Sequence, residues 1–141
     1  MNFFLTISHT TNCSPLIISI PHSGIDIPES IQNRINQQAK RIHTDWKLDL
    51  LLQEFPFTKI STSISRYVVD VNRSKYTSKT SIRPIIPRYD EFGMPLFKQY
   101  PSKSTQQQWL KKYYTPYYDA LFKHITVKKQ NNSIVCLLDL H

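Results

Sequence analysis

The chain has 141 residues, 40% of them apolar, which is enough for one small globular domain with its own core. No segment approaches the roughly 20 apolar residues that cross a bilayer, and the first five residues lack the basic and long apolar regions of a signal peptide, so we expect a cytoplasmic protein. A net charge of +8 attracts anions, but the lysines are not grouped as a nucleic-acid recognition helix, so a solvated basic surface or an anionic small-molecule partner is favoured over nucleic acid.

Apolar and amphipathic segments alternate along the chain, which predicts an α/β fold. Pro28 and Glu29 suit the first turn of a helix, and Phe55-Pro56 should end the next one. Helices are expected near 29–40, from 44 or 45 to about 54, and from 104 or 105 onwards. Strands are expected at 15–21, 58–64, 66–71 and 133–140, with a possible edge strand at 2–8. Pro116 should kink or split the last helix.

The stretch 74–104 shows little periodicity. It contains Pro84, Pro87, Pro95, Pro101 and Gly93. A loop of this length in a small domain is usually a functional lid or disordered. Its first part is basic and could bind an anionic substrate.

The two cysteines, Cys13 and Cys136, lack the spacing of a zinc or redox pair. Cys136 lies in an apolar strand and is expected to be a small buried side chain. We therefore assign no chemistry to either thiol.

Two histidines follow apolar strands directly. His22 comes after the run 15–21, and His141 comes after the run 133–138. Side chains just past the carboxyl ends of parallel strands line the binding crevice of an open α/β sheet. A single histidine after a strand is more often structural, but two that close neighbouring strands could hold a zinc ion. A buried final strand would also normally be followed by a segment that covers it.

Two further segments carry candidate chemistry. Asp45 stands at the start of an expected helix, where an acid is also favoured by the helix dipole alone. The segment 65–73 contains Arg66, Asp70, Asn72 and Arg73 near the end of an expected strand. A surface Asp–Arg ion pair would be the simplest account of it.

Taken together, these segments resemble the N-formylglutamate amidohydrolase family. The similarity rests on Pro15–Gly24, Thr44-Asp45-Trp46, Ser65–Arg73 and Leu138–His141, with weaker similarity at Met94–Phe97 and Tyr114–Tyr118. The resemblance implies an α/β fold of the phosphorylase/hydrolase-like, zinc-carboxypeptidase-like type, with a mixed sheet flanked by helices. It also implies a zinc-dependent amidohydrolase that converts N-formyl-L-glutamate to formate and L-glutamate in histidine degradation.

The resemblance also implies roles for individual residues. The zinc ligands would be His22, His141 and a carboxylate, for which we choose Asp45 because Ile25 stands where distant relatives have a glutamate ligand. Another divalent metal could replace zinc, and His43 could be an alternative ligand or a supporting partner. Arg66 would stabilise the oxyanion, and Asn72 and Arg73 would bind a substrate carboxylate. Asp70 would orient Arg66 or Arg73, and Arg83 or Arg88 could bind the second carboxylate.

Members of this family continue well beyond the Asp-x-His motif, and their later part brings the expected general base. We therefore interpret residues 1–141 as the N-terminal portion of a single metallohydrolase domain, incomplete without a C-terminal portion. One hypothesis is a truncated form that is inactive or depends on a complementing chain. The other is a shortened, non-catalytic protein that binds acidic small molecules.

Overall fold

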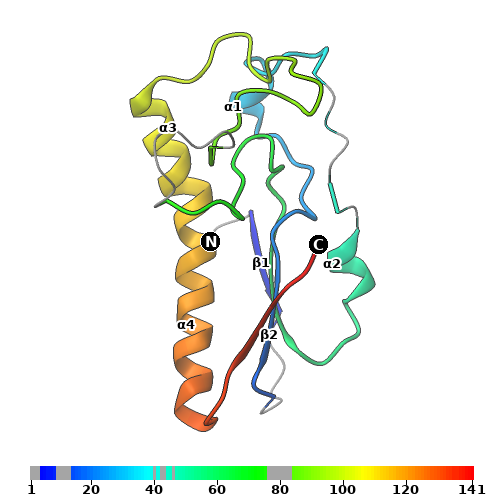
Figure 1. Ribbon diagram of the computed structural model, residues 1–141, viewed down its shortest axis with the longest axis vertical. Coiled ribbons are helices and arrows are strands. Elements are labelled where there is room, and N and C mark those ends of the chain that lie inside the picture. Colours follow the sequence, from blue (N-terminus) through cyan, green and yellow to red (C-terminus); the bar gives the residue numbers. More distant parts are fainter. Residues whose placement is uncertain (1–3, 9–13, 40, 42–43, 46, 76–83) are drawn as a thin grey trace.

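The computed structural model describes residues 4–8, 14–39, 41, 44–45, 47–75 and 84–141. They form a four-stranded mixed sheet with the strand order β1-β3-β2-β4 (Figure 1). The strands are β1 (Leu5–Ser8), β2 (Leu16–Ile20), β3 (Thr58–Thr62) and β4 (Cys136–Asp139). The strand β2 pairs in parallel with both β3 and β4, whereas β1 runs antiparallel to β3. The expected edge strand near the N-terminus and the parallel pairing of the two histidine-bearing strands are both confirmed.

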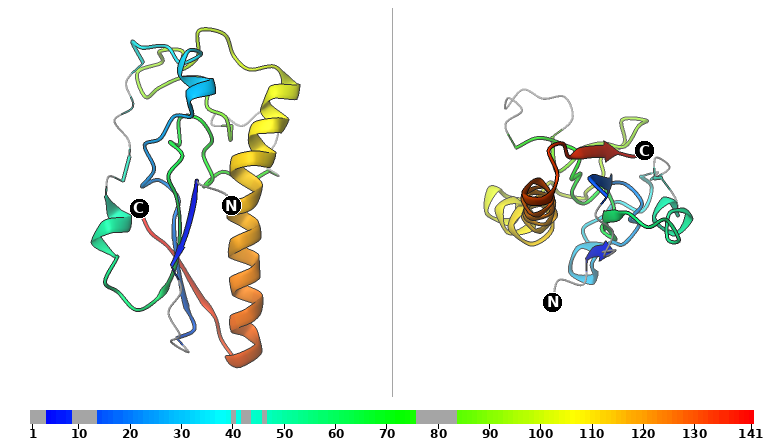
Figure 2. Two further views of the ribbon diagram at one scale, coloured as in Figure 1. Left: turned by 180° about the vertical axis from the view of Figure 1, so that it is seen from behind. Right: turned by 90° about the horizontal axis from the view of Figure 1, so that it is seen from below.

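The sheet lies between a long helix on one side and the short helix α2 (Leu48–Leu51) on the other (Figure 2). The two inner strands, β2 and β3, are almost fully buried. Apolar side chains of the sheet and the long helix form one core, which includes Ile17, Ile60, Leu96, Tyr117 and Leu121. Within the described residues, no helix is both long and apolar enough to cross a bilayer.

The long helix consists of α3 (Lys103–Trp109), a π-helical segment η1 (Leu110–Tyr114) and α4 (Thr115–Asn131). It begins at Ser102, whose side chain accepts a hydrogen bond from the Thr105 N–H. Pro116 has no N–H for the carbonyl four residues earlier, and the wider π turn just before it accommodates this loss. In place of the kink or split expected at Pro116, the structure therefore has a π-helical segment within one continuous helix.

Three predicted elements are shorter than expected or absent. The first helix, α1, spans only Glu29–Gln32, and α2 starts at Leu48 because Lys47 has a left-handed backbone with φ of 60°. The predicted strand at 66–71 is wrong. Ser65 there accepts hydrogen bonds from the Val68 and Val69 N–H groups, which makes a turn. The apolar run around Val68 imitates a strand because its valines are buried in the core.

The final strand is also shorter than expected, and its burial was predicted wrongly. All four residues of β4 are exposed, including Cys136. The strand lies at the edge of the sheet and pairs only with β2, so within the described part of the chain nothing covers its outer side. Its apolar side chains Leu137 and Leu138, and that of Ile134 shortly before it, are consequently exposed.

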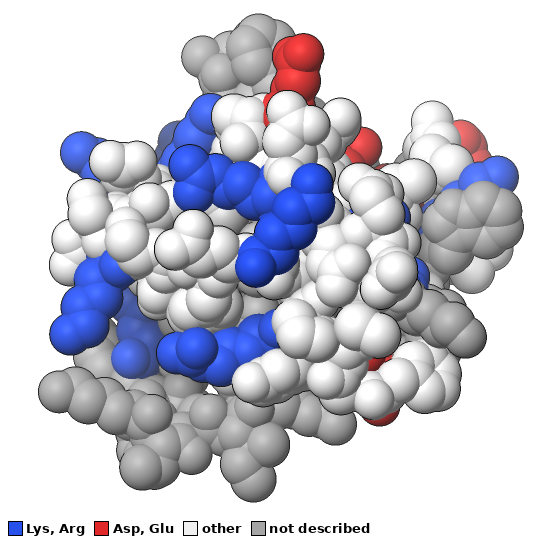
Figure 3. Space-filling view, turned by 90° about the horizontal axis from the view of Figure 1, so that it is seen from above, with Lys and Arg blue, Asp and Glu red and all other residues white. Residues whose placement is uncertain are grey.

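The stretch before α3 has neither helix nor strand between 84 and 101. It is nevertheless anchored, because Ile86, Leu96 and Phe97 are buried in the core and Phe97 pairs with Ile35 through an isolated bridge. Lysine and arginine side chains outnumber acidic ones on the face at this end of the molecule (Figure 3). Cys13 and the part of the predicted lid at 76–83 lie outside the described residues.

Candidate metal centre

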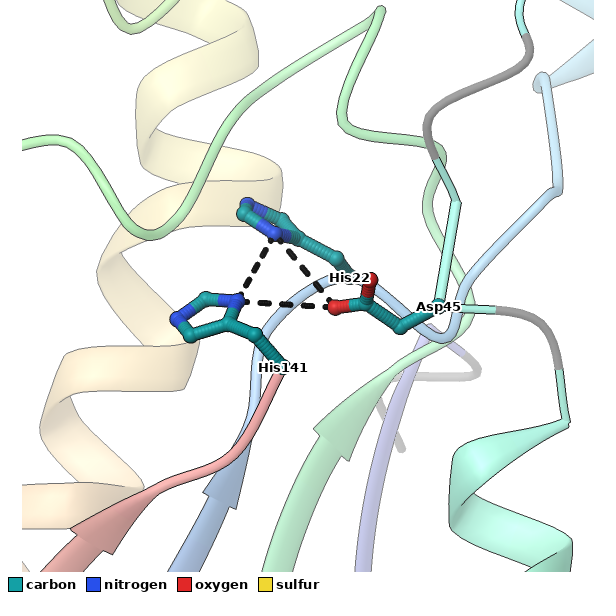
Figure 4. Close-up of side chains that lie close together, drawn as sticks. All are labelled: His22, Asp45 and His141. Carbon is teal, nitrogen blue, oxygen red and sulfur yellow. Dashed lines mark hydrogen bonds and ion pairs between the residues drawn. The ribbon is translucent and has the colours of Figure 1, made fainter.

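Three side chains from separate parts of the sequence meet at the carboxyl ends of the parallel strands (Figure 4). His22 follows β2 and His141 follows β4, and their Nδ1 atoms lie 3.2 Å apart. The Asp45 Oδ2 atom lies 3.4 Å from Nδ1 of His141 and 3.7 Å from Nδ1 of His22. The parallel pairing of β2 with β4 places the two strand ends, and hence the two imidazoles, side by side.

The three facing atoms have the spacing of ligands around one metal ion. Ligand atoms bound at about 2.0–2.2 Å to a tetrahedral zinc ion lie about 3.3–3.6 Å from one another. The Asp45 Oδ2 atom is buried and has no hydrogen-bond partner in the described part of the chain. Two imidazole nitrogens and one carboxylate oxygen are a donor set typical of catalytic zinc sites, so the residues present fit a divalent metal ion.

Backbone contacts hold Asp45 against the strand end. The Asp45 N–H donates to the His22 carbonyl at 3.0 Å, and the Asp45 carbonyl accepts from the Leu48 N–H at 3.2 Å. Ile25 has no side-chain ligand atom and is 60% exposed. The carboxylate beside the two histidines therefore comes from Asp45.

The Asp70 carboxylate is buried and contacts several other residues of the site. It lies 2.8 Å from Nε2 of His22, 3.1 Å from Nη2 of Arg66 and 3.3 Å from Nε of Arg73. It also accepts the Asn72 N–H at 3.0 Å. Burial alone would raise the pKa of the Asp70 carboxyl. The His22 hydrogen bond, the Arg66 guanidinium and the Asn72 N–H outweigh burial and lower this pKa below its usual value.

These contacts fix the proton on His22. An Nε2–H that donates to Asp70 leaves Nδ1 unprotonated and free for a metal. Arg66 supports the same assignment, because its Nη1 lies 3.4 Å from Nδ1 of His22 and an N–H can donate only to an unprotonated nitrogen. The turn at 65–73 thus brings Arg66 and Arg73 beside the histidines.

His141 has weaker support on its outer nitrogen. Its Nε2 lies 3.4 Å from the Asp139 carboxylate and 3.2 Å from the amide nitrogen of Asn72. These three side chains are exposed.

Several supporting residues were not foreseen from the sequence. Ser19, Tyr117 and Asp139 are joined by hydrogen bonds, while the hydroxyls of Tyr114 and Tyr118 donate to the Arg73 and Val71 carbonyls. The signals that could have indicated them are a serine inside an apolar strand and tyrosines spaced three and four residues apart on one helix.

Gly24 lies in the turn that follows His22, where the sequence suggests a close approach of the backbone to a ligand. A Cβ at this position would lie 2.4 Å from the Ser63 backbone, so the turn after His22 packs directly on the loop after β3. The absence of a side chain at Gly24 therefore allows the approach of the two segments.

Of the remaining predicted site residues, the structure describes Arg88. Arg88, a candidate for the second carboxylate, has its guanidinium 3.9 Å above the Tyr100 ring. His43, Trp46 and Arg83 lie outside the described residues.

Residues 14–141 match the family model of N-formylglutamate amidohydrolase. The chain belongs to this family. It is 27% identical over 136 residues to an N-formylglutamate deformylase of Pseudomonas aeruginosa, a match that covers 90% of this chain and 51% of the relative. A deformylase of Pseudomonas putida is 25% identical over 138 residues, with the same coverages. The chain thus spans about half the length of the curated relatives it matches.

Solved structures show the same fold. The crystal structure of N-formylglutamate amidohydrolase from Ralstonia eutropha JMP134 superposes with a TM-score of 0.85 at 20% identity, over 98% of this chain and 57% of that one. A gene product of Agrobacterium tumefaciens gives a TM-score of 0.79 at 16% identity, over 98% and 56% of the two chains. The mixed α/β architecture is therefore that of the family.

Proposed function

We propose that this chain provides the metal-binding portion of an amidohydrolase that releases formate from N-formyl-L-glutamate. The convergence of His22, Asp45 and His141 at one strand edge carries the proposal. Membership of the family supports the substrate, and the resemblance implies a role in histidine degradation. Zinc is the proposed metal, although the same donors suit other divalent ions. A zinc-carboxypeptidase-like character of the fold is part of this proposal.

The bound metal ion would supply a water of lowered pKa and would polarise the formyl carbonyl. Arg66 brings a guanidinium to 3.4 Å from Nδ1 of His22. We assign it the stabilisation of negative charge on the carbonyl oxygen, because a fixed cation is most effective where that charge develops. Asp70 holds Arg66 in place and remains ionised, so it orients rather than transfers protons.

Asn72 and Arg73 are the proposed contacts for a substrate carboxylate. Arg73 offers a planar fork that can bind a carboxylate through two hydrogen bonds. Its backbone is fixed by the Tyr114 hydroxyl, which donates to the Arg73 carbonyl at 2.7 Å. The second carboxylate of the substrate would be bound elsewhere in the basic loop, for which Arg83 and Arg88 stay candidates.

We further propose that a polypeptide corresponding to the rest of the relatives' length covers β4, whether it belongs to the same protein or to a second chain. Two observations support this coverage: β4 has exposed apolar residues, and in the described part of the chain it pairs on one side only, with β2. Such a segment would enclose the metal centre and bring the general base. The second candidate function, non-catalytic binding of acidic small molecules, is favoured only by the exposure of His141 in the described structure.

The test is formate release from N-formylglutamate by the zinc-loaded chain, alone and with the second half of the Pseudomonas aeruginosa deformylase as a separate polypeptide. We expect little activity alone and measurable turnover in the mixture. Arg66→Ala should then lower kcat, whereas Arg73→Lys should mainly raise KM. Turnover by the chain alone near the usual range of about 1–10³ s⁻¹ would contradict the need for a second segment. Substrate binding without turnover in both samples would favour the non-catalytic function.

A further inference from the structure

A chain of hydrogen bonds runs from the long helix to the exposed metal ligand. The Tyr117 hydroxyl, on α4, lies 2.8 Å from Oγ of Ser19 on β2. Ser19 Oγ donates in turn to Oδ1 of Asp139 on β4 at 2.6 Å. A serine hydroxyl has one proton, and Asp139 receives it, so in the 2.8 Å contact Tyr117 is the donor to Ser19. The other acceptor near the Tyr117 hydroxyl, the Ile60 carbonyl, is farther away at 3.4 Å. The direction of the chain is therefore fixed, from Tyr117 through Ser19 to Asp139.

The geometry of the sheet builds this chain. Ser19 and Asp139 are direct partners in the parallel register of β2 with β4, and the Leu140 N–H donates to the Ser19 carbonyl at 2.9 Å. Ser19 and Tyr117 are buried, whereas Asp139 is exposed. Burial raises the pKa of Tyr117 well above its usual range, so its hydroxyl stays protonated and keeps donating. The exposed Asp139 carboxylate is thus held in place by two buried side chains, those of Ser19 and Tyr117.

The anchored carboxylate faces one nitrogen of His141. Oδ1 of Asp139 is occupied by Ser19, and the other oxygen, Oδ2, lies 3.4 Å from Nε2 of His141. A carboxylate accepts hydrogen bonds and cannot donate them, so this contact requires an Nε2–H. In this tautomer Nδ1 keeps the lone pair that faces His22 and Asp45.

Asn72 competes for the same atom. Its amide nitrogen lies 3.2 Å from Nε2 of His141, and an amide N–H can donate only to an unprotonated Nε2. That arrangement would move the imidazole proton to Nδ1, where it would block a metal. At Nδ1 of His141, the unprotonated Nδ1 of His22 at 3.2 Å and the Asp45 carboxylate at 3.4 Å could likewise accept this proton. Among these four neighbours, Asp139 favours the metal-binding tautomer, in which Nε2 carries the proton.

We propose that Ser19 and Tyr117 are positioning residues that act through Asp139 to select the metal-binding tautomer of His141. The proposal rests on the metal centre of the proposed function and deepens it. Ser19 fixes the carboxylate, Tyr117 fixes the orientation of the Ser19 hydroxyl, and the result is a second histidine held as His22 is held by Asp70. Each imidazole of the centre then has a carboxylate on its outer nitrogen and a free Nδ1 on its inner side.

The first test is the tautomer of His141 in the metal-free chain, read from its ¹⁵N chemical shifts near pH 8, where an ordinary imidazole is neutral. We expect protonated Nε2 in the wild type. Asp139→Asn should shift His141 toward the Nδ1–H form, because the new amide can itself donate to Nε2. Ser19→Ala and Tyr117→Phe should cause smaller shifts in the same direction.

Tyr118→Phe is the matched control, since it removes a hydroxyl from the same helix whose partner is the Val71 carbonyl. A general loosening of the helix would change the tautomer in this variant too, and that result would overturn the proposal. An Nδ1–H tautomer in the wild type, or equal spectra for wild type and Asp139→Asn, would also overturn it.

The second test is zinc affinity, measured by competition with a chromophoric chelator. Removal of a supporting partner of a ligating histidine typically weakens metal binding about 10–100-fold, and we expect about tenfold for Asp139→Asn and less for Ser19→Ala. Equal affinities in these variants and the wild type would contradict the inference but not the proposed function. No zinc binding by the wild type would contradict the proposed function, whereas the tautomer measurement would still decide the inference.

Discussion

The two histidines of the candidate metal centre face their carboxylates in different environments, one buried and one exposed. His22 donates to Asp70 over 2.8 Å, and the two side chains are only 4% and 6% exposed. His141 faces Asp139 over 3.4 Å, with the side chains 40% and 43% exposed. One half of the site, built by β2 and the turn at 65–73, is therefore part of the core. The other half, carried by β4, lies at an exposed edge.

Because of this difference, substitutions in the two halves should differ in how they affect folding stability and metal affinity. A buried ion pair that loses one partner leaves a charge without water or counter-charge, which is strongly destabilising. An exposed pair is screened by water and contributes little to stability. Changes in the buried half should consequently affect folding and metal affinity together, whereas changes in the exposed half should affect metal affinity alone.

The largest expected effect is that of Asp70→Asn. This change removes the charge that faces Arg66 and Arg73 and replaces one of the two acceptor oxygens of Asp70 with an NH2 donor. We expect a loss of about 3–5 kcal/mol in the free energy of unfolding, measured by urea denaturation without metal. Asp139→Asn is the matched control, with an expected loss below about 1 kcal/mol. Similar losses in both variants would remove the distinction between the two halves.

Gly24→Ala tests how tightly the buried half is packed. The new Cβ would lie 2.4 Å from the Ser63 backbone, which cannot move aside as a flexible side chain would. We expect a loss of about 2–3 kcal/mol in the free energy of unfolding. Gly93→Ala meets no atom within 4 Å but has φ of 82°, so it should lose about 1 kcal/mol from backbone strain alone. A neutral Gly24→Ala variant would show that the turn after His22 is not confined.

Tyr117 links the buried half to the exposed one, and its contribution depends on pH. Burial is the main reason that its pKa is raised. The unfolded chain therefore loses this proton first, and stability falls as the pH rises above about 10. Tyr117→Phe should lose about 1 kcal/mol at neutral pH but should lack up to about 1.4 kcal/mol per pH unit of the alkaline decline. Parallel curves of unfolding free energy against pH for the two proteins would contradict this assignment.

Leu138→Lys should have the smallest effect on stability and the clearest effect on solubility. Leu138 is exposed on the β4 edge, so its replacement should change the free energy of unfolding by less than about 0.5 kcal/mol. A lysine on an edge strand opposes pairing with another chain. Light scattering of concentrated samples should therefore show less association than in the wild type. Unchanged association would show that the chains do not associate through the β4 edge at Leu138.

The sequence predicts the site correctly where a local residue pattern also determines the position of a side chain in the fold. His22 and His141 each close an apolar run, and the rule that parallel strands end at one edge was sufficient to predict that they meet. Asp45 was harder to predict, because it is held beside the strand end by a backbone hydrogen bond to the His22 carbonyl, which no residue pattern indicates. Its choice rested on the family resemblance and on the absence of a carboxylate at Ile25.

The errors have physical causes as well. The valines of 68–71 look like a strand because burial, which favours β-branched residues, is common to strands and to turns packed into a core. The run at 134–138 looked buried, but an apolar sequence shows only that a segment can be covered. The link from Ser19 to Asp139 could not be foreseen, because a cross-strand pair is defined by register rather than by sequence spacing.

The most direct test of the account is X-ray absorption at the zinc edge of the chain loaded with one equivalent of zinc. We predict one bound ion with two imidazole nitrogens and carboxylate oxygen at about 2.0–2.2 Å. His22→Ala and His141→Ala should each lose one imidazole, and Asp45→Ala should lose the carboxylate contribution. Zinc bound without imidazole, or spectra unchanged by all three substitutions, would contradict the claim that these residues form the metal centre.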